Sequence, residues 1–127
     1  MALPESAQMY LETIHILSRR QETVHAVDVG EYMHFSKPSV SHALKLLREG
    51  GYITVDADRH IFLTDEGKRV AEDMYARHTV LTRLLTSLGV SGDTAERDAC
   101  LIEHDLSEES FEAIRKTVEK HKEKSSG

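Results

Sequence analysis

Hydrophobic residues recur at helical spacing near the start of the chain. They occupy Ala7, Tyr10, Leu11, Ile14 and Leu17. This spacing predicts an amphipathic helix that ends near residues 19–22. Met9, Glu12 and Ile16 project from its other side, because each residue turns the helix by about 100°. We therefore expect the helix to contact neighbouring structure on two sides.

Two short helices and a hairpin are predicted next. The first helix covers residues 25–34, and Ser36 is expected to cap the second, with Pro38 in its first turn. The buried positions of the second helix are Val40, Ala43, Leu44 and Leu47, and two glycines follow it. Residues 52–55 and 61–63 are rich in β-forming side chains and flank a polar turn. Helices joined by a tight turn and followed by such a hairpin are typical of a winged helix-turn-helix domain.

The rest of the chain is predicted to be helical. A long helix begins at residues 64–67 and runs to about Leu88, with an apolar stripe that includes His78. Two more helices are expected over residues 93–105 and 107–120. The predicted fold is mainly α with a small β wing: residues 1–63 form the winged domain and residues 64–124 an all-helical domain. Residues 125–127, Ser-Ser-Gly, are expected to be a cloning remnant outside the fold.

Composition and charge restrict the function. The 127 residues are 39% hydrophobic and 30% charged and contain no apolar run of about 18 residues, so we expect a cytoplasmic protein without a membrane span. A net charge of −6 argues against a non-specific nucleic-acid coat protein. However, residues 36–48 carry Lys37, Lys45 and Arg48 and no acid. This indicates a locally basic element on an acidic body.

Metal-ligating residue types occur on three predicted helices. Cys100, Glu103 and His104 would share one arc of a helix, where thiolate, carboxylate and imidazole are a set of metal ligands. The alternative is a buried cysteine beside surface charges. His78 could equally be a core histidine, Met9 a packing residue and Glu12 a solvated charge. Convergence of the three helices on one pocket would favour a metal site.

Taken together, these motifs resemble the diphtheria-toxin-repressor and manganese-transport-regulator family of bacterial metal-activated repressors. The resemblance covers Glu5 to about Val118. It rests on the segments 9–14, 36–41, 63–67, 77–78 and 100–104. It implies a DNA-binding winged helix over residues 1–63, a dimerisation and metal-binding domain over residues 64–124, and a metal bound between them.

The resemblance also implies the ligand set and the metal. The family's ligand positions fall on Met9, Glu12, His78, Cys100, Glu103 and His104. Methionine and cysteine at Met9 and Cys100 match the iron branch, whereas Glu12 matches the manganese branch. Thr82 and Glu96 stand where the iron branch carries an ancillary Glu and His. The two sulfur donors favour Fe(II), with Mn(II) next, while Co(II), Ni(II) or Zn(II) can bind in vitro.

The implied function is a homodimeric repressor of metal-uptake or metal-homeostasis genes that binds double-stranded operator DNA of pseudopalindromic sequence. We expect DNA contacts from exposed hydroxyl and basic groups near the second helix of the motif and the hairpin tip. The expected residues are Ser36, Lys37, Pro38, Ser39, Ser41, His42, Lys45 and Arg59. No membrane or small organic substrate is expected as a partner.

Three other functions are compatible with parts of the pattern. A winged-helix regulator could sense a small organic ligand and have no functional metal site. A zinc hydrolase built on Cys100, Glu103 and His104 would need an open coordination position and a substrate cleft. The sequence shows no phosphate-binding loop or nucleophile elbow, so we expect no enzymatic activity. A purely structural dimer module would leave the basic stretch 36–48 without a purpose.

Overall fold

A computed structural model describes residues 3–126 of the chain, with side chains described for residues 3–120. It contains, in order, α1 (Glu5–Arg20), α2 (Ala26–Met33), α3 (Lys37–Glu49), β1 (Ile53–Val55), β2 (Ile61–Leu63), α4 (Asp65–Ser87), α5 (Gly92–Ile102) and α6 (Glu108–Ser126). The chain divides into two compact units, Met1–Asp73 and Met74–Gly127, and the division falls inside α4. The mainly helical fold with one small sheet confirms the predicted fold class.

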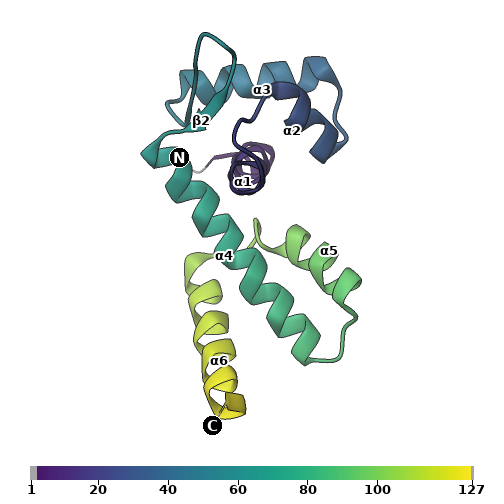
Figure 1. Ribbon diagram of the computed structural model, residues 1–127. Helices are drawn as coiled ribbons and strands as arrows, with labels where there is room; N and C mark the ends of the chain where they lie inside the picture. The colour runs from purple at the N-terminus through teal and green to yellow at the C-terminus, as the bar shows by residue number, and fades with distance from the viewer. Residues whose placement is uncertain (1–2, 127) are drawn as a thin grey trace. The chain divides into compact units, whose positions relative to one another are not determined.

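The first unit is a winged helix built around α1. Figure 1 shows α2, α3 and the hairpin grouped around this helix, and α1 contacts α2, α3 and β2. The two strands are antiparallel, with Ile53 opposite Leu63. Leu11 and Ile14 of α1 are fully buried in a core shared with Val40 of α3. Burying each such side chain contributes about 1.5–3 kcal/mol, so the predicted hydrophobic pattern accounts for this packing.

Helix α3 starts and ends as its sequence predicts. The backbone N–H of Ser39 donates to the Ser36 hydroxyl at 3.4 Å, and Pro38 lies in the first turn. Beyond the helix, Gly51 takes a positive φ of 83°, which a residue with a Cβ adopts only with strain. The first turn of α3 contains no acid, whereas each of the other five helices has at least one there.

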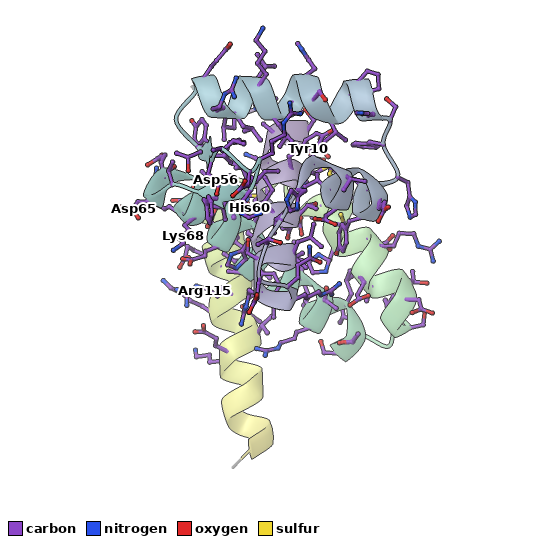
Figure 2. The ribbon with its side chains drawn as sticks, turned by 45° about the horizontal axis from the view of Figure 1, so that its top comes forward. Tyr10, Asp56, His60, Asp65, Lys68 and Arg115 are labelled. Carbon is purple, nitrogen blue, oxygen red and sulfur yellow. The ribbon has the colours of Figure 1, made fainter. Side chains whose placement is uncertain are left out.

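Asp56 organises the tip of the wing. Its carboxylate accepts hydrogen bonds from the backbone N–H groups of Asp58 and His60, both at 2.9 Å. The His60 backbone contact, followed by the charge of the His60 ring, holds the pKa of Asp56 below its ordinary value. Between these residues, Arg59 adopts a left-handed backbone with φ of 64°. Asp56 and His60 lie close together in Figure 2, and this network fixes how the wing presents Arg59.

The start of α4 packs tightly on the wing. Thr64 caps the helix, since its hydroxyl accepts the Gly67 N–H at 3.2 Å, and its own N–H donates to the Tyr52 carbonyl at 3.0 Å. A Cβ placed on Gly67 would lie 2.0 Å from that same Tyr52 oxygen. Glycine is therefore required at this position by a close approach of two backbone segments.

The second unit consists of the later part of α4 with α5 and α6. In Figure 1, α5 runs back along α4 after the connecting turn. The helix predicted over residues 93–105 is wrong at its end, because α5 stops at Ile102 and residues 103–105 form a turn. The N–H of Asp105 donates to the Ile102 carbonyl at 2.9 Å. This hydrogen bond closes a tight turn that follows the helix. Ser107 caps α6, since its hydroxyl accepts a hydrogen bond from the Ser110 N–H at 3.1 Å.

Two further findings concern the chain as a whole. Within residues 3–126, no helix is both long and apolar enough to cross a membrane. The predicted cloning remnant covers residues 125–127. The side chains of these residues, and Gly127 as a whole, lie outside the described part of the chain.

Candidate metal centre

Glu103 is the centre of a buried cluster in the second unit. Its side chain is 0% exposed, and each of its carboxylate oxygens faces an imidazole. Oε2 lies 3.0 Å from Nδ1 of His78, and Oε1 lies 3.3 Å from Nε2 of His104. The His104 backbone reaches solvent, but its side chain is only 1% exposed. Within the second unit, the structure therefore brings together three of the six predicted ligands.

This donor set fits a divalent metal ion. A buried carboxylate is costly unless a cation or hydrogen-bond donors compensate it, and here imidazoles surround it. One carboxylate and two imidazoles form a ligand set that suits Fe(II), Mn(II), Co(II) and Zn(II). Cys100 lies one helical turn before Glu103 and is half-buried, so a sulfur donor lies close by in the sequence. Binding a metal here displaces protons from the imidazole and thiol groups, which links affinity to pH.

Arg77 fixes the backbone of the turn that carries Glu103 and His104. This side chain of α4 is 5% exposed, and its Nη1 donates to the carbonyl oxygens of Glu103 at 3.1 Å and Leu106 at 2.7 Å. Its guanidinium also lies over the ring of Phe111 on α6, 5.1 Å from the ring centroid. Sequence analysis assigned no role to Arg77 beyond its place in a motif beside His78, because its hydrogen-bond partners lie 26 and 29 residues away.

The other two predicted ligands lie on α1, in the first unit. Met9 is half-buried, and Glu12, one turn later, is among the buried residues of the helix. Their spacing places the thioether and the carboxylate on one face of α1, as predicted. At the positions of the ancillary ligands, the Thr82 hydroxyl donates to the His78 carbonyl at 2.7 Å and Glu96 is exposed.

The eight residues predicted to contact DNA are all exposed. Ser41 and Lys45 of α3 and Arg59 of the wing line a cleft of about 600 Å³ in the first unit. The prediction omitted two residues that line the same cleft, Arg48 on α3 and His25 at the start of α2. Arg48 follows Lys45 by three residues, so its helical position was a usable signal. His25 joins the cleft through tertiary folding, with its ring 4.7 Å from that of His60.

Two of the predicted DNA contacts have a local structural role as well. The Ser36 hydroxyl donates to the Ser39 hydroxyl at 2.9 Å and accepts the Ser39 N–H. Both side chains thus take part in the cap of α3. Lys37, Pro38 and His42 lie on the exposed start of the helix, outside the lining of the cleft.

A winged helix, followed by helices that hold a buried carboxylate between imidazoles, defines the class of metal-dependent DNA-binding regulators. Comparison with protein families agrees with this class. Residues 2–61 match the iron-dependent repressor N-terminal DNA-binding domain, and residues 64–127 match the iron-dependent repressor metal-binding and dimerisation domain. The chain belongs to this family, which confirms the resemblance found in the sequence.

Similar proteins occur on both the manganese and the iron side of the family. The chain is 38% identical over 112 residues to the transcriptional regulator MntR of Escherichia coli O6:H1, covering 88% of this chain and 72% of that protein. It is 31% identical over 108 residues to the iron-dependent repressor IdeR of Mycobacterium bovis, covering 84% of this chain and 47% of the relative.

A solved structure of the manganese regulator SloR superimposes with a TM-score of 0.80 at 27% identity, covering 94% of this chain and 55% of SloR. A manganese-dependent transcriptional repressor in complex with manganese also gives a TM-score of 0.80, at 29% identity, covering 88% of this chain and 52% of the other. The chain thus spans about half the length of these solved proteins.

Proposed function

We propose that this chain is a metal-activated repressor that binds double-stranded operator DNA as a homodimer when loaded with Fe(II) or Mn(II). Its targets would be genes of metal uptake or metal homeostasis. The observation that carries the proposal is the buried Glu103 carboxylate, whose two oxygens face His78 and His104. The names of the relatives, a transcriptional regulator and an iron-dependent repressor, support the regulatory role.

The proposed metal ligands come from both units. His78, Glu103, His104 and Cys100 supply donors from α4, α5 and the turn after it, and Met9 and Glu12 supply a thioether and a carboxylate from α1. The bound ion would supply a positive charge shared by all six groups. In this assignment residues 1–63 read DNA and residues 64–124 bind metal and dimerise, and the chain has no catalytic role.

DNA would contact α3 and the wing. Lys45, Arg48 and Arg59 line one cleft together with Asp56, and the first turn of α3 contains no acid. Such a surface suits phosphates, which supply much of the affinity of a DNA-binding protein. A dimer must also hold two recognition helices at the spacing of the operator half-sites.

Activation would follow from a shift in population. If the metal binds the DNA-competent arrangement more tightly than the others, metal binding enriches that arrangement. The coupling is reciprocal, so saturating operator DNA should raise metal affinity by the same factor.

Binding to operator DNA is expected to require metal. In an anaerobic gel-shift assay, the metal-free chain should bind weakly, Fe(II) or Mn(II) should strengthen binding by about 5- to 150-fold, and chelator should reverse the effect. Lys45→Glu serves as a control, because it should lose DNA binding while it retains metal affinity. DNA binding that ignores both metal and chelator would instead support a regulator that senses an organic ligand.

The choice of metal is expected to depend on the two sulfur donors. Exchanging both, in Met9→Asp combined with Cys100→Glu, replaces soft ligands by hard carboxylates and should shift activation from Fe(II) toward Mn(II). The ratio of Fe(II) to Mn(II) concentrations that gives half-maximal DNA binding measures the shift. The same ratio before and after the exchange would contradict sulfur-based selectivity.

A further inference from the structure

Two consecutive residues of α4 contact Glu103, one at its carboxylate and the other at its backbone carbonyl. His78 contacts the carboxylate at 3.0 Å, while Arg77 donates to the backbone carbonyl of the same residue at 3.1 Å. The side chain and the main chain of Glu103 are therefore both tied to one short segment of a regular helix. A ligand held in this way has little freedom to leave its position.

Arg77 supplies hydrogen-bond donors to two carbonyl groups around the end of α5. The last carbonyls of a helix have no donor within the helix, and the chain leaves α5 after Ile102. The guanidinium satisfies the Glu103 carbonyl just beyond that end and the Leu106 carbonyl just before α6. Arg77 thus spans the connection that contains His104, from one end to the other.

The guanidinium is itself held in place. It is buried, and its Cζ lies 5.1 Å from the centroid of the Phe111 ring of α6. Phe111 is 5% exposed, so this ring is a fixed part of the second unit. Arg77 therefore connects α4, the turn and α6 through a planar group with a defined orientation.

We propose that Arg77 is a positioning residue for the Glu103–His104 pair: it holds the backbone of the turn so that the carboxylate stays between the two imidazoles. The inference rests on the proposed function, because it concerns the same metal site. Arg77 is not a ligand and acts through the residues it orients. Loss of such supporting contacts weakens metal affinity by about 10- to 100-fold in other metal sites.

The test compares Co(II) binding by Arg77→Met and Arg77→Lys with that of the unaltered chain. Arg77→Met removes the donors, and Arg77→Lys keeps a charge but loses the planar group. Co(II) affinity, measured by titration, should fall by about 10- to 100-fold in Arg77→Met and less in Arg77→Lys. The visible d–d spectrum of the Co(II) complex should change in the same order, since the carboxylate and His104 would be displaced.

Two controls separate a positioning role from a general effect on folding. Arg83→Met alters an exposed arginine on the same helix and should leave affinity and spectrum unchanged. Thermal unfolding without metal shows whether each variant folds. If Arg77→Met does not fold, the Co(II) affinity and spectrum of Arg77→Lys test the proposal. A lower unfolding temperature with unchanged Co(II) affinity and spectrum would overturn the proposal.

His78→Ala distinguishes a failure of the proposed metal site from a failure of the proposed role of Arg77. If the unaltered chain binds Co(II) and His78→Ala does not, the metal site stands and the Arg77 variants test the inference alone. If the unaltered chain shows no Co(II) binding, the proposed function itself fails.

Discussion

Glu103→Gln is expected to abolish the response of the protein to metal. The substitution preserves the size of the side chain but removes the charge that lies between His78 and His104. A metal present at about 100 times its dissociation constant stabilises the folded state by about 2.7 kcal/mol, and this increment should vanish in the variant. Thermal unfolding with and without Mn(II) measures it directly. Metal-dependent DNA binding should disappear in parallel.

Glu109→Gln provides the matched control for this result. It makes the same chemical change at an exposed residue in the first turn of α6. The control should keep the full metal-dependent rise in unfolding temperature. If Glu103→Gln keeps it too, Glu103 is not a metal ligand.

Gly67→Ala should severely destabilise the winged domain. The new Cβ would lie 2.0 Å from the Tyr52 carbonyl oxygen, a backbone atom that already accepts the Thr64 N–H. A flexible side chain could move aside, but this oxygen can move only if the backbone between α3 and β1 shifts. Overpacking typically costs about 1–3 kcal/mol, and we expect a loss at or above the upper end. Urea unfolding followed by circular dichroism would measure it.

Gly92→Ala is the corresponding control for glycine replacement. No atom lies within 4 Å of a Cβ at this position, which is the first residue of α5. The change should be neutral or stabilise the protein by up to about 1 kcal/mol through the unfolded state. Equal losses in the two variants would contradict the close-approach explanation for Gly67.

The parts of the fold that depend on nearby residues were predictable from the sequence. Helix α3 has its cap, its proline and its terminating glycines within the segment 36–51, so its bounds followed from local chemistry. The same holds for the wing, where two β-rich runs enclose a polar turn. The end of α5 was not predictable, because Arg77, far earlier in the chain, binds the carbonyls beyond it.

The types of residue in the candidate site were predictable from the sequence, but their arrangement in space was not. Helical spacing indicated that Glu103 and His104 share an arc with Cys100, but both residues lie in the turn after α5, where the His104 Nε2 is 3.3 Å from the Glu103 carboxylate. Likewise, periodicity on α3 identified Lys45, whereas His25 lines the same cleft only through the folding of the hairpin beside α2. Contacts between distant segments leave no periodic signal in a single sequence.

The first turn of α3 contains no acid, and this affects how the protein would approach DNA. A protein of net charge −6 repels a polyanion over much of its surface. Five helices carry Asp or Glu in the first turn, where these residues offset the positive end of the helix, whereas the first turn of α3 contains none. Under the proposed contact of α3 with DNA, the acidic surface would repel collisions in other orientations, and collisions that bring α3 toward the phosphates would be favoured. The acidic residues elsewhere on the molecule would thus help to select the orientation in which the protein approaches DNA.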